Sequence, residues 1–239
     1  KVSCSLNGKN IAIGDPEYFI NKSYTLSYFT KTKSGTSFHN YIPHLYLWNR
    51  YNMYTFNNEG LWLHNVEGKF QTFYGVYYPF SVEYSVNFED AFVFGSTVLD
   101  TEAYVYKKDG YIYKPQTFDK VLAYNSHQVS GIRDCVVNDD MDIVQRSVEN
   151  DEVVKLDYKN RIWTYSGITD KIIDENDFIF DNAMEVGPKP LNNTNIDKNH
   201  IKNNIFYDNY LVNRLIFSKF DDLKLILKKI QTNVSYKSR

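Results

Sequence analysis

The hydrophobic and polar positions along this chain follow the pattern of strands joined by short turns. The stretch SVEYSVN (81–87) alternates polar and apolar side chains with a period of two, as in a strand with one buried and one solvated face. Short apolar runs predict further strands at 11–13 and 24–29, and two more around a turn at 130–131 within 119–139. Helix-period patterns are scarce, so the sequence predicts a mainly β fold with few helices.

Three segments place the same residue types around a turn. They read YTFNNEGLWLHN (54–65), YVYKKDGYIYKP (104–115) and VKLDYKNRIWTY (154–165). Their Tyr, Thr, Val, Phe, Trp and Ile residues fit a pleated, half-buried surface. Short loops often need a positive φ, which Gly and Asn tolerate best, and these residue types occupy the turns as Gly60, Gly110 and Asn160. Each segment therefore predicts an antiparallel β-hairpin.

The three turns are evenly spaced along the chain. The intervals 110 − 60 and 160 − 110 both equal 50 residues, which is near the length of a propeller blade. We therefore expect a roughly 50-residue repeat, arranged as a propeller or as a sandwich. The alternative is that a Tyr-rich β protein repeats a small set of turn residues by chance.

Composition along the chain predicts three parts. Residues 1–184 carry the candidate hairpins and form the expected β-hairpin-rich domain, whereas residues 185–205 are polar, bear prolines and a glycine, and predict a connection. Residues 206–239 hold two apolar runs and predict a C-terminal β-hairpin that packs on the main domain or on a neighbouring subunit. Within the first part, KTKSGTS (31–37) predicts a loop. The segment 37–50, broken by Pro43, predicts an edge or bulged strand.

Composition and charge narrow the class of protein. Aromatic residues make up 17% of the 239 residues, with 21 Tyr and 16 Phe, which favours a folded chain over a disordered one. The net charge is −2 with both signs mixed, so we expect no nucleic-acid recognition, and no apolar run has the roughly 20 residues of a membrane span. Cys4 and Cys135 are too few for a disulfide framework or a usual zinc site, so we expect reduced thiols. The chain begins at Lys1 without Met, so we expect a processed product or a portion of a longer protein.

The candidate catalytic and metal-binding residues form no strong motif. His39 and His44 with a carboxylate come nearest to a metal site, yet we expect packed or solvent-facing histidines. Cys135 follows Asp134, whose charge opposes thiolate formation, so a buried structural thiol is expected. Asp139, Asp140 and Asp142 resemble half of a calcium loop but lack the closing bidentate Glu. We expect that run to be a solvated turn.

A carbohydrate-active protein is the alternative class. A glycoside hydrolase needs two carboxylates facing a cleft, and the sequence offers candidates without placing any two together; these are Asp15, Glu83 and Asp134. Exposed tryptophans stack on sugars, but large aromatics more often belong to cores or interfaces; the candidates are Trp48, Trp62 and Trp163. We therefore predict that the chain is not an enzyme, and we assign it no catalytic, cofactor-binding or metal residue. A propeller or sandwich that binds or hydrolyses surface glycans stays open as the second interpretation.

Several segments, taken in order, resemble one family of proteins. They are SFHNYIPHLYLWNRYNMYTFNNEGLWLHN (37–65), GKFQTFYGVYYPFSVEYSVN (68–87), FDKVLAYNSHQVSG (118–131), DNYLVNRLIF (208–217), LKLIL (223–227) and NVSYKSR (233–239). This ordered set is similar to the large tail proteins of crAss-like bacteriophages, in particular the tail muzzle, or tail stabilisation, protein.

The resemblance implies a structural component of the virion. It implies a homo-oligomeric ring in the distal tail, in contact with other tail proteins, and it brings no catalytic residues to this chain. Members of the family are much longer, so the resemblance also implies that this chain is a C-terminal portion. A host-surface glycan would be an additional partner, for which the sequence offers no support.

Overall fold

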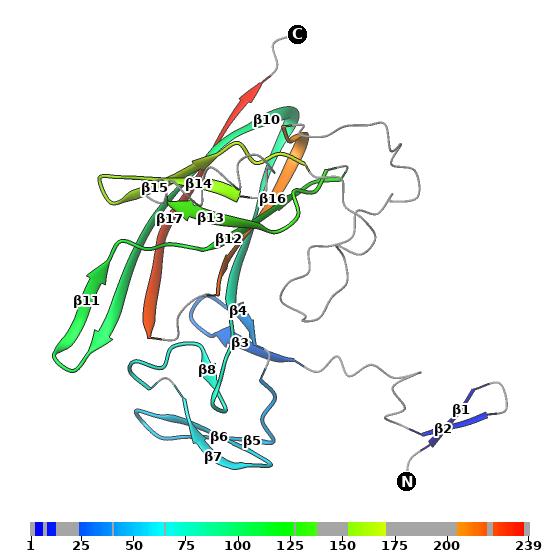
Figure 1. Ribbon diagram of the computed structural model, residues 1–239. Coiled ribbons are helices and arrows are strands. Elements are labelled where there is room, and N and C mark those ends of the chain that lie inside the picture. Colours follow the sequence, from blue (N-terminus) through cyan, green and yellow to red (C-terminus); the bar gives the residue numbers. More distant parts are fainter. Residues whose placement is uncertain are drawn as a thin grey trace. The chain divides into compact units, whose positions relative to one another are not determined.

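The computed structural model is built of strands (Figure 1). It describes residues 3–6, 9–12, 24–39, 41–64, 66–126, 128–137, 153–170, 205–218 and 222–236. Within these ranges there is no helix, so the prediction of a mainly β fold is confirmed. The chain divides into two compact units, Lys1–Asn65 and Val66–Arg239. This division does not correspond to the expected boundary after residue 184.

The first unit holds three small antiparallel sheets. Their strands are β1 (Ser3–Leu6) with β2 (Lys9–Ala12), β3 (Thr25–Phe29) with β4 (Ser34–His39), and β5 (Leu45–Trp48), β6 (Met53–Asn57) and β7 (Gly60–Leu63) in that order. The loop predicted at 31–37 is shorter than expected. Strand β4 already begins at Ser34, because Ser34 and Gly35 pair with Phe29 and Tyr28 of β3.

The second unit holds one large sheet and a two-stranded one. The small sheet pairs β8 (Thr72–Phe73) with β9 (Val76–Tyr77). The large sheet contains β10 (Phe80–Lys107), β11 (Gly110–Lys114), β12 (Lys120–Tyr124), β13 (Arg133–Val137), β14 (Val153–Lys159), β15 (Ile162–Ser166), β16 (Tyr207–Phe217) and β17 (Leu223–Tyr236). Strand β10 has 28 residues, whereas most strands have about 5–6. It pairs with four partners, namely β11, β15, β16 and β17.

Six strands of the large sheet close into a barrel. Following the hydrogen bonds, the order is β10, β16, β12, β13, β14, β15 and back to β10. The contact between β13 and β14 is parallel, and the other five are antiparallel. Each antiparallel contact reverses the strand direction, so a closed ring of straight strands needs an even number of such contacts. This ring has five, so one of its strands must change direction within its own length.

Strand β10 makes this change of direction. Its register with β16 shifts between Asn87 and Phe92, and Figure 1 shows the strand bending there, so that its two arms run in different directions. The first arm, residues 80–87, pairs with β16. The second arm, residues 92–107, pairs with β15 and β11 on one edge and with β17 on the other, and its first two residues, Phe92 and Val93, also pair with the start of β16. Because of this bend, β10 can pair with both β16 and β15, the two strands at the ends of the row, and so close the ring.

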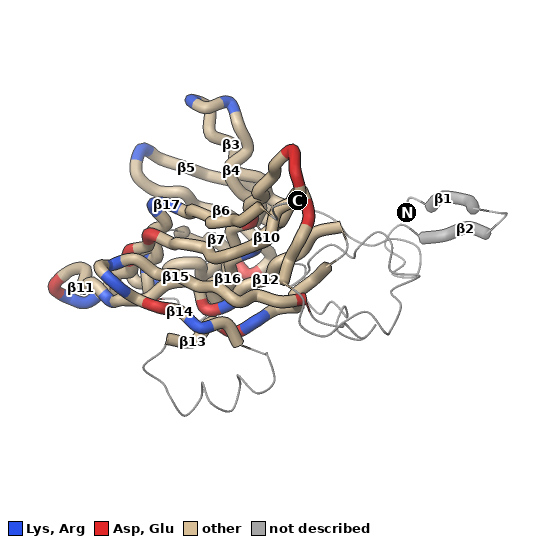
Figure 2. Tube along the Cα trace, turned by 90° about the horizontal axis from the view of Figure 1, so that it is seen from above, with Lys and Arg blue, Asp and Glu red and all other residues tan. Residues whose placement is uncertain are grey.

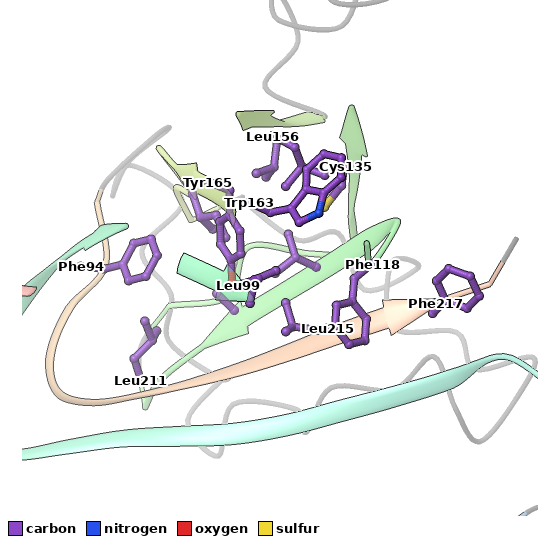
Figure 3. Packing of buried hydrophobic residues seen from close by; sticks show 14 of the residues in the cluster. Phe94, Leu99, Phe118, Cys135, Leu156, Trp163, Tyr165, Leu211, Leu215 and Phe217 are labelled. Atoms are coloured by element: carbon purple, nitrogen blue, oxygen red, sulfur yellow. The ribbon is translucent and has the colours of Figure 1, made fainter. Parts of the chain in front are cut away.

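The hydrophobic core fills the space enclosed by these strands (Figure 3). Inward positions on the first arm of β10 alternate with exposed ones, which confirms the period-two strand predicted at 81–87. Burying side chains as large as Trp163, Tyr165, Phe118 and Phe217 contributes about 1.5–3 kcal/mol each. Figure 3 shows the indole of Trp163 pointing toward Cys135 and Leu156, within this cluster.

The last two strands do not form the expected hairpin. Strands β16 and β17 exist as predicted, but they do not pair with each other. Strand β16 lies between β10 and β12, and β17 pairs along the opposite edge of β10. Pairing with β10 gives each of these strands a long ladder within a large sheet, whereas pairing with each other alone would form a two-stranded ribbon, which is marginally stable in water.

The three predicted hairpins are present, whereas the 50-residue repeat is not confirmed. Closing pairs are Asn57–Gly60, Lys107–Gly110 and Lys159–Ile162, so the intervals are 107 − 57 = 50 and 159 − 107 = 52. In the first two hairpins the glycine is the first residue after the two-residue loop. In the third hairpin Asn160 is itself a loop residue, and Asn160 and Arg161 have φ of 54° and 66°. The hairpins also belong to different sheets or to different places in one sheet.

Candidate functional site: an open strand edge

Strand β5 presents an uncharged and exposed edge. Its sequence is Leu-Tyr-Leu-Trp, and all four side chains are exposed. One edge of the strand pairs with β6, and no strand among the described residues pairs with the other. Pro43 precedes the strand, so the prediction of an edge strand after this proline is confirmed. An exposed, hydrophobic strand edge is a template for pairing with another chain.

A tight turn fixes the register of this edge. Asn49 closes the turn between β5 and β6, because its Oδ1 accepts hydrogen bonds from the amides of Tyr51 and Asn52 at 2.9 and 2.8 Å. The amide of Asn49 in turn donates to the carbonyl of Asn52 at 3.0 Å. The turn carries two of the most exposed aromatics of the chain, Trp48 at 79% and Tyr51 at 84%. Because the turn is rigid, these rings are held outward at the end of the edge.

A small aromatic stack supports the sheet from within. Tyr41 is the only buried hydrophobic residue among the described residues of the first unit. Its ring stacks on His64 at 5.6 Å and contacts His39 at 5.3 Å between ring centroids. His64 is hydrogen-bonded to Thr55, and His39 to Ser27 and Ser37. Burial lowers the pKa of both histidines below the ordinary value of 6.5, so the stack favours neutral imidazoles.

The remaining strands of this unit add more exposed apolar surface. Strands β3 and β4 expose Leu26, Tyr28, Phe29 and Phe38 to a large extent, and Tyr24, which directly precedes β3, is exposed as well. Strands β5, β6 and β7 carry no charged residue, and Figure 2 draws them in the tan of uncharged residues. Monomeric proteins seldom expose apolar residues in such concentration unless a partner covers them.

The long edge of β17 is protected where β5 is not. It carries Lys224, Lys228 and Lys229 as exposed side chains, and its register against β10 shifts at Asp100–Thr101. Lys228 forms an ion pair with Glu102 at this irregularity. Lysines and bulges are the usual devices that prevent edge-to-edge pairing. The contrast directs attention to β5 as the edge that is open to a partner.

The candidate metal residues are not brought into one site. His39 is bound to hydroxyls of its own hairpin, whereas His44 is exposed at the start of β5. Across the described residues there is no group of three or more His, Cys, Asp or Glu side chains that could hold a metal ion. The acidic run Asp139, Asp140 and Asp142 lies outside the described residues.

The thiol and tryptophan candidates divide by burial. Cys135 is a buried cysteine of the core that forms no disulfide with a described residue, as expected; nothing is described of the Cys4 side chain. Trp163 is a core residue. It is therefore not available to stack on a sugar, the role for which it was a candidate. Trp62 is half-buried and its indole N–H donates to Asn57 Oδ1 at 3.0 Å. Only Trp48 of the three fits the role of an exposed stacking platform.

The candidate carboxylates have other contacts. Glu83 accepts hydrogen bonds from Arg214, with Nη2 at 2.6 Å and Nε at 2.8 Å. Burial, with Glu83 as the next contribution, raises the pKa of Tyr124 to about 12. Asp134 is exposed on β13, and Asp15 lies outside the described residues. Among the described candidates, Glu83 is held by Arg214 and Asp134 lies exposed on a different strand, so neither is placed by its described contacts in a pair of the kind a hydrolase requires.

The segment 125–131 acts as a polar clasp. Gln128 accepts a hydrogen bond from the amide of Tyr207 at 2.8 Å and donates to the carbonyl of Ile205 at 3.1 Å. Ser126 donates to Asp208 at 2.6 Å. These bonds fix the entry into β16, so the segment that the sequence singled out for a turn at 130–131 and for its resemblance has a structural role.

Sequence reasoning missed several polar residues of the interior. His64 and Asn213 are buried. Both are polar residues beside apolar ones in a strand-like sequence, and such a pattern also fits a side chain that faces solvent. Asp119 is buried as well, and accepts two hydrogen bonds from Ser218. Residues that are distant in the sequence make these contacts, so no local signal identifies them.

Comparisons with known proteins add no family. A scan against protein-family models finds no match, and a search of curated proteins finds no match either. Within the described residues, no helix has the length and apolarity needed to cross a membrane.

Proposed function

We propose that this chain is a non-enzymatic structural component of a crAss-like phage tail, the C-terminal portion of a muzzle or tail stabilisation protein. The observation that carries the proposal is the open, uncharged edge of β5. This edge lies within 37–65, the longest of the segments that resemble those tail proteins. The function of such a chain is to hold shape through its subunit interfaces.

The physical argument rests on how symmetric assemblies close. A ring repeats one heterologous contact between copies until the last copy meets the first. That contact needs a surface that gains by being covered, and a bare hydrophobic strand edge beside exposed aromatics is such a surface. The partners are further copies of this chain and other tail proteins, and the location is the virion.

The second unit supports the proposal as a rigid frame. Closing six strands into a barrel removes most strand edges, and lysines with a bulge protect the edge of β17. Association is therefore directed to the first unit, and the barrel keeps its own shape.

The test is the state of association of the purified chain. Sedimentation velocity across a concentration series is expected to show assembly that grows with concentration. Leu47→Lys places a charge on the exposed edge of β5 and is expected to weaken association at least about tenfold. The matched control is Ile226→Lys, the same kind of change on the edge of β17, which already carries lysines, and it leaves association unchanged.

Two results would contradict the proposal. One is a chain that stays monomeric at every concentration. The other is a Leu47→Lys variant that assembles as well as the unchanged chain while Ile226→Lys does not.

A second candidate function is favoured by one observation. Trp48 and Tyr51 project from a single rigid turn, and exposed aromatic rings of this kind stack on sugars. Non-catalytic binding to a bacterial surface glycan would lose its affinity in Trp48→Ala. A glycan array screened with the unchanged chain, Trp48→Ala and Leu47→Lys separates this function from assembly. Glycan binding would be lost in Trp48→Ala and kept in Leu47→Lys, because Leu47→Lys leaves the turn in place.

A further inference from the structure

The barrel interior contains polar atoms that the core does not satisfy. Asn213 is 0% exposed, and neither its amide nitrogen nor its amide oxygen has a hydrogen-bond partner among the described residues. Tyr165 is 1% exposed, and its hydroxyl makes no hydrogen bond of normal geometry in the described part of the chain, although the Thr97 and Tyr84 hydroxyls lie near it. Both side chains belong to the inward faces of strands that line the ring.

These two residues lie at the ends of one polar row. Asn213 of β16 stands opposite Tyr84 of β10. The Tyr84 hydroxyl lies 3.4 Å from Thr97 Oγ1 and 3.3 Å from Thr232 Oγ1, and Thr97 pairs directly with Tyr165. The row therefore joins both arms of β10 across the core. Both of these contacts are longer than the usual 2.7–2.8 Å of O–H···O hydrogen bonds.

The row is surrounded by apolar packing. Leu211 and Leu215 flank Asn213 on its strand, and Trp163 accompanies Tyr165 on β15. Figure 3 shows Tyr165 and Trp163 pointing into the same cluster. Burial, followed by the neighbouring Tyr84, raises the pKa of Tyr165 well above its ordinary value, so its hydroxyl keeps its proton and can donate.

Leaving such groups without partners is costly. An amide side chain has two donor hydrogens and a carbonyl that accepts twice, and a buried polar atom with no partner pays its full desolvation penalty. Native interiors avoid this penalty through protein partners or buried water.

We propose that the barrel encloses a hydration site, in which buried water bridges the Asn213 amide and the polar row from Tyr84 to Tyr165. Water fits because every group in the row is neutral and either donates, accepts or does both. A cation would find no carboxylate in the row, and an anion no cationic side chain. The bound water fixes the amide of Asn213 and joins the two arms of the bent strand.

A high-resolution crystal structure of the whole chain tests the location. The expected result is ordered density within hydrogen-bond distance of Asn213 Oδ1 or Nδ2 and of the Tyr165 hydroxyl. Apolar side chains packed directly against both groups, with no such density, would overturn the proposal. Density of a larger organic molecule would overturn it as well, since the site would then bind a ligand other than water.

The sign of a stability change gives a second test. If water satisfies the amide, Asn213→Leu loses its hydrogen bonds and lowers the melting temperature by about 2–8 °C. If the amide is unsatisfied, the same substitution removes a penalty and raises the melting temperature. Tyr165→Phe gives the same contrast at the other end of the row.

A matched control separates hydration from packing. Tyr207→Phe removes the same hydroxyl from an exposed ring and should leave the melting temperature within about 1 °C. An increase in Tyr165→Phe beyond that of Tyr207→Phe would contradict the proposal, even if Asn213→Leu fails to fold.

Discussion

Gln128 shows how much one side chain can organise at the residue scale. Its amide oxygen accepts from the Asn125 side chain at 3.0 Å and from the Tyr207 backbone at 2.8 Å, while its nitrogen donates to the Ile205 carbonyl. One residue thus joins the turn after β12 to the start of β16, across 79 positions of sequence.

The first prediction concerns this clasp. Gln128→Ala removes four hydrogen bonds, the fourth being a long one from Nε2 to Asp170 Oδ2 at 3.4 Å. It also leaves the backbone amide of Tyr207 without its acceptor, so the free energy of unfolding should fall by about 1–3 kcal/mol. Urea denaturation measures the change. Gln231→Ala on the exposed face of β17 is the control and should cost less than about 0.5 kcal/mol. Equal effects of the two substitutions would show that the clasp does not stabilise the fold.

The second prediction concerns Gly95 in β10. A Cβ at this position would lie 2.9 Å from the backbone oxygen of Asn233, where the register between β10 and β17 shifts. Backbone gives way less easily than a side chain, so Gly95→Ala should destabilise the second unit by about 1–3 kcal/mol. Ser235→Ala, an exposed position on the same pair of strands, serves as control. Thermal unfolding that leaves Gly95→Ala as stable as Ser235→Ala would contradict the close approach.

Single residues were predictable where the cause is local. Gly60, Gly110 and Asn160 all have positive φ as expected, because turn geometry depends on neighbours in sequence. The burial of Trp163 was open from the sequence, since an aromatic residue beside a turn fits a core or a surface equally well. Asn213 gave no signal at all, because its environment is made by β10 and β12.

At the scale of elements, the stack of Tyr41 with His39 and His64 links two sheets of the first unit. His39 is the last residue of β4 and pairs with Thr25 at the open end of the β3–β4 hairpin, and His64 follows β7. Hydroxyl groups of Ser27, Ser37 and Thr55 are hydrogen-bonded to the two imidazoles, and the Tyr41 ring packs against both. Burial of these rings opposes their protonation.

The third prediction is a pH dependence of this unit. Both histidines have a lower pKa in the folded chain than the ordinary value of 6.5, so the unfolded chain binds more protons as pH falls below about 6.5. Stability is therefore complete above that pH and is lost between about 6.5 and the lower folded pKa. Urea titrations at several pH values, followed by NMR signals of residues 24–64, measure the loss.

A double substitution isolates the cause. His39→Gln with His64→Gln should flatten the dependence, whereas His44→Gln, at an exposed position, should leave it intact. A dependence that persists in the double variant would assign it to other groups.

The prediction of elements succeeded for strands and failed for their partners. Alternation and turn residues located the three hairpins, β10's first arm and the two strands near the C-terminus. They did not reveal that β16 and β17 pair with β10 instead of with each other, because pairing depends on edges that are supplied by distant segments. The loop predicted at 31–37 failed for a related reason, since pairing with β3 extends β4 back to Ser34.

At the scale of the whole molecule, β10 organises the second unit. It supplies both ends of the six-stranded ring and also carries β11 and β17 (Figure 1). A strand of 28 residues has the same two-residue period as a short strand. The sequence pattern therefore does not show that β10 is long enough to pair with four strands, and the barrel could not be inferred from it. Even spacing of hairpins suggested a repeat, and the pairings place those hairpins in unlike surroundings.

The edges of β5 and β17 differ in how readily each could pair with another chain, because the β5 edge is uncharged and apolar and the β17 edge carries lysines and a bulge. In the proposed assembly, the β5 edge would be covered by a ring neighbour or by another tail protein. Together with the ordered resemblance to tail proteins, this asymmetry is the basis of the proposed structural role.

Immunogold electron microscopy of purified crAss-like virions that encode this chain tests that role most directly. The account predicts gold particles at the distal end of the tail, bound by an antibody raised against the chain, with no label on particles that lack it. Label absent from virions, or present only in host-cell fractions, would contradict the account and make the glycan-binding alternative the next to be tested.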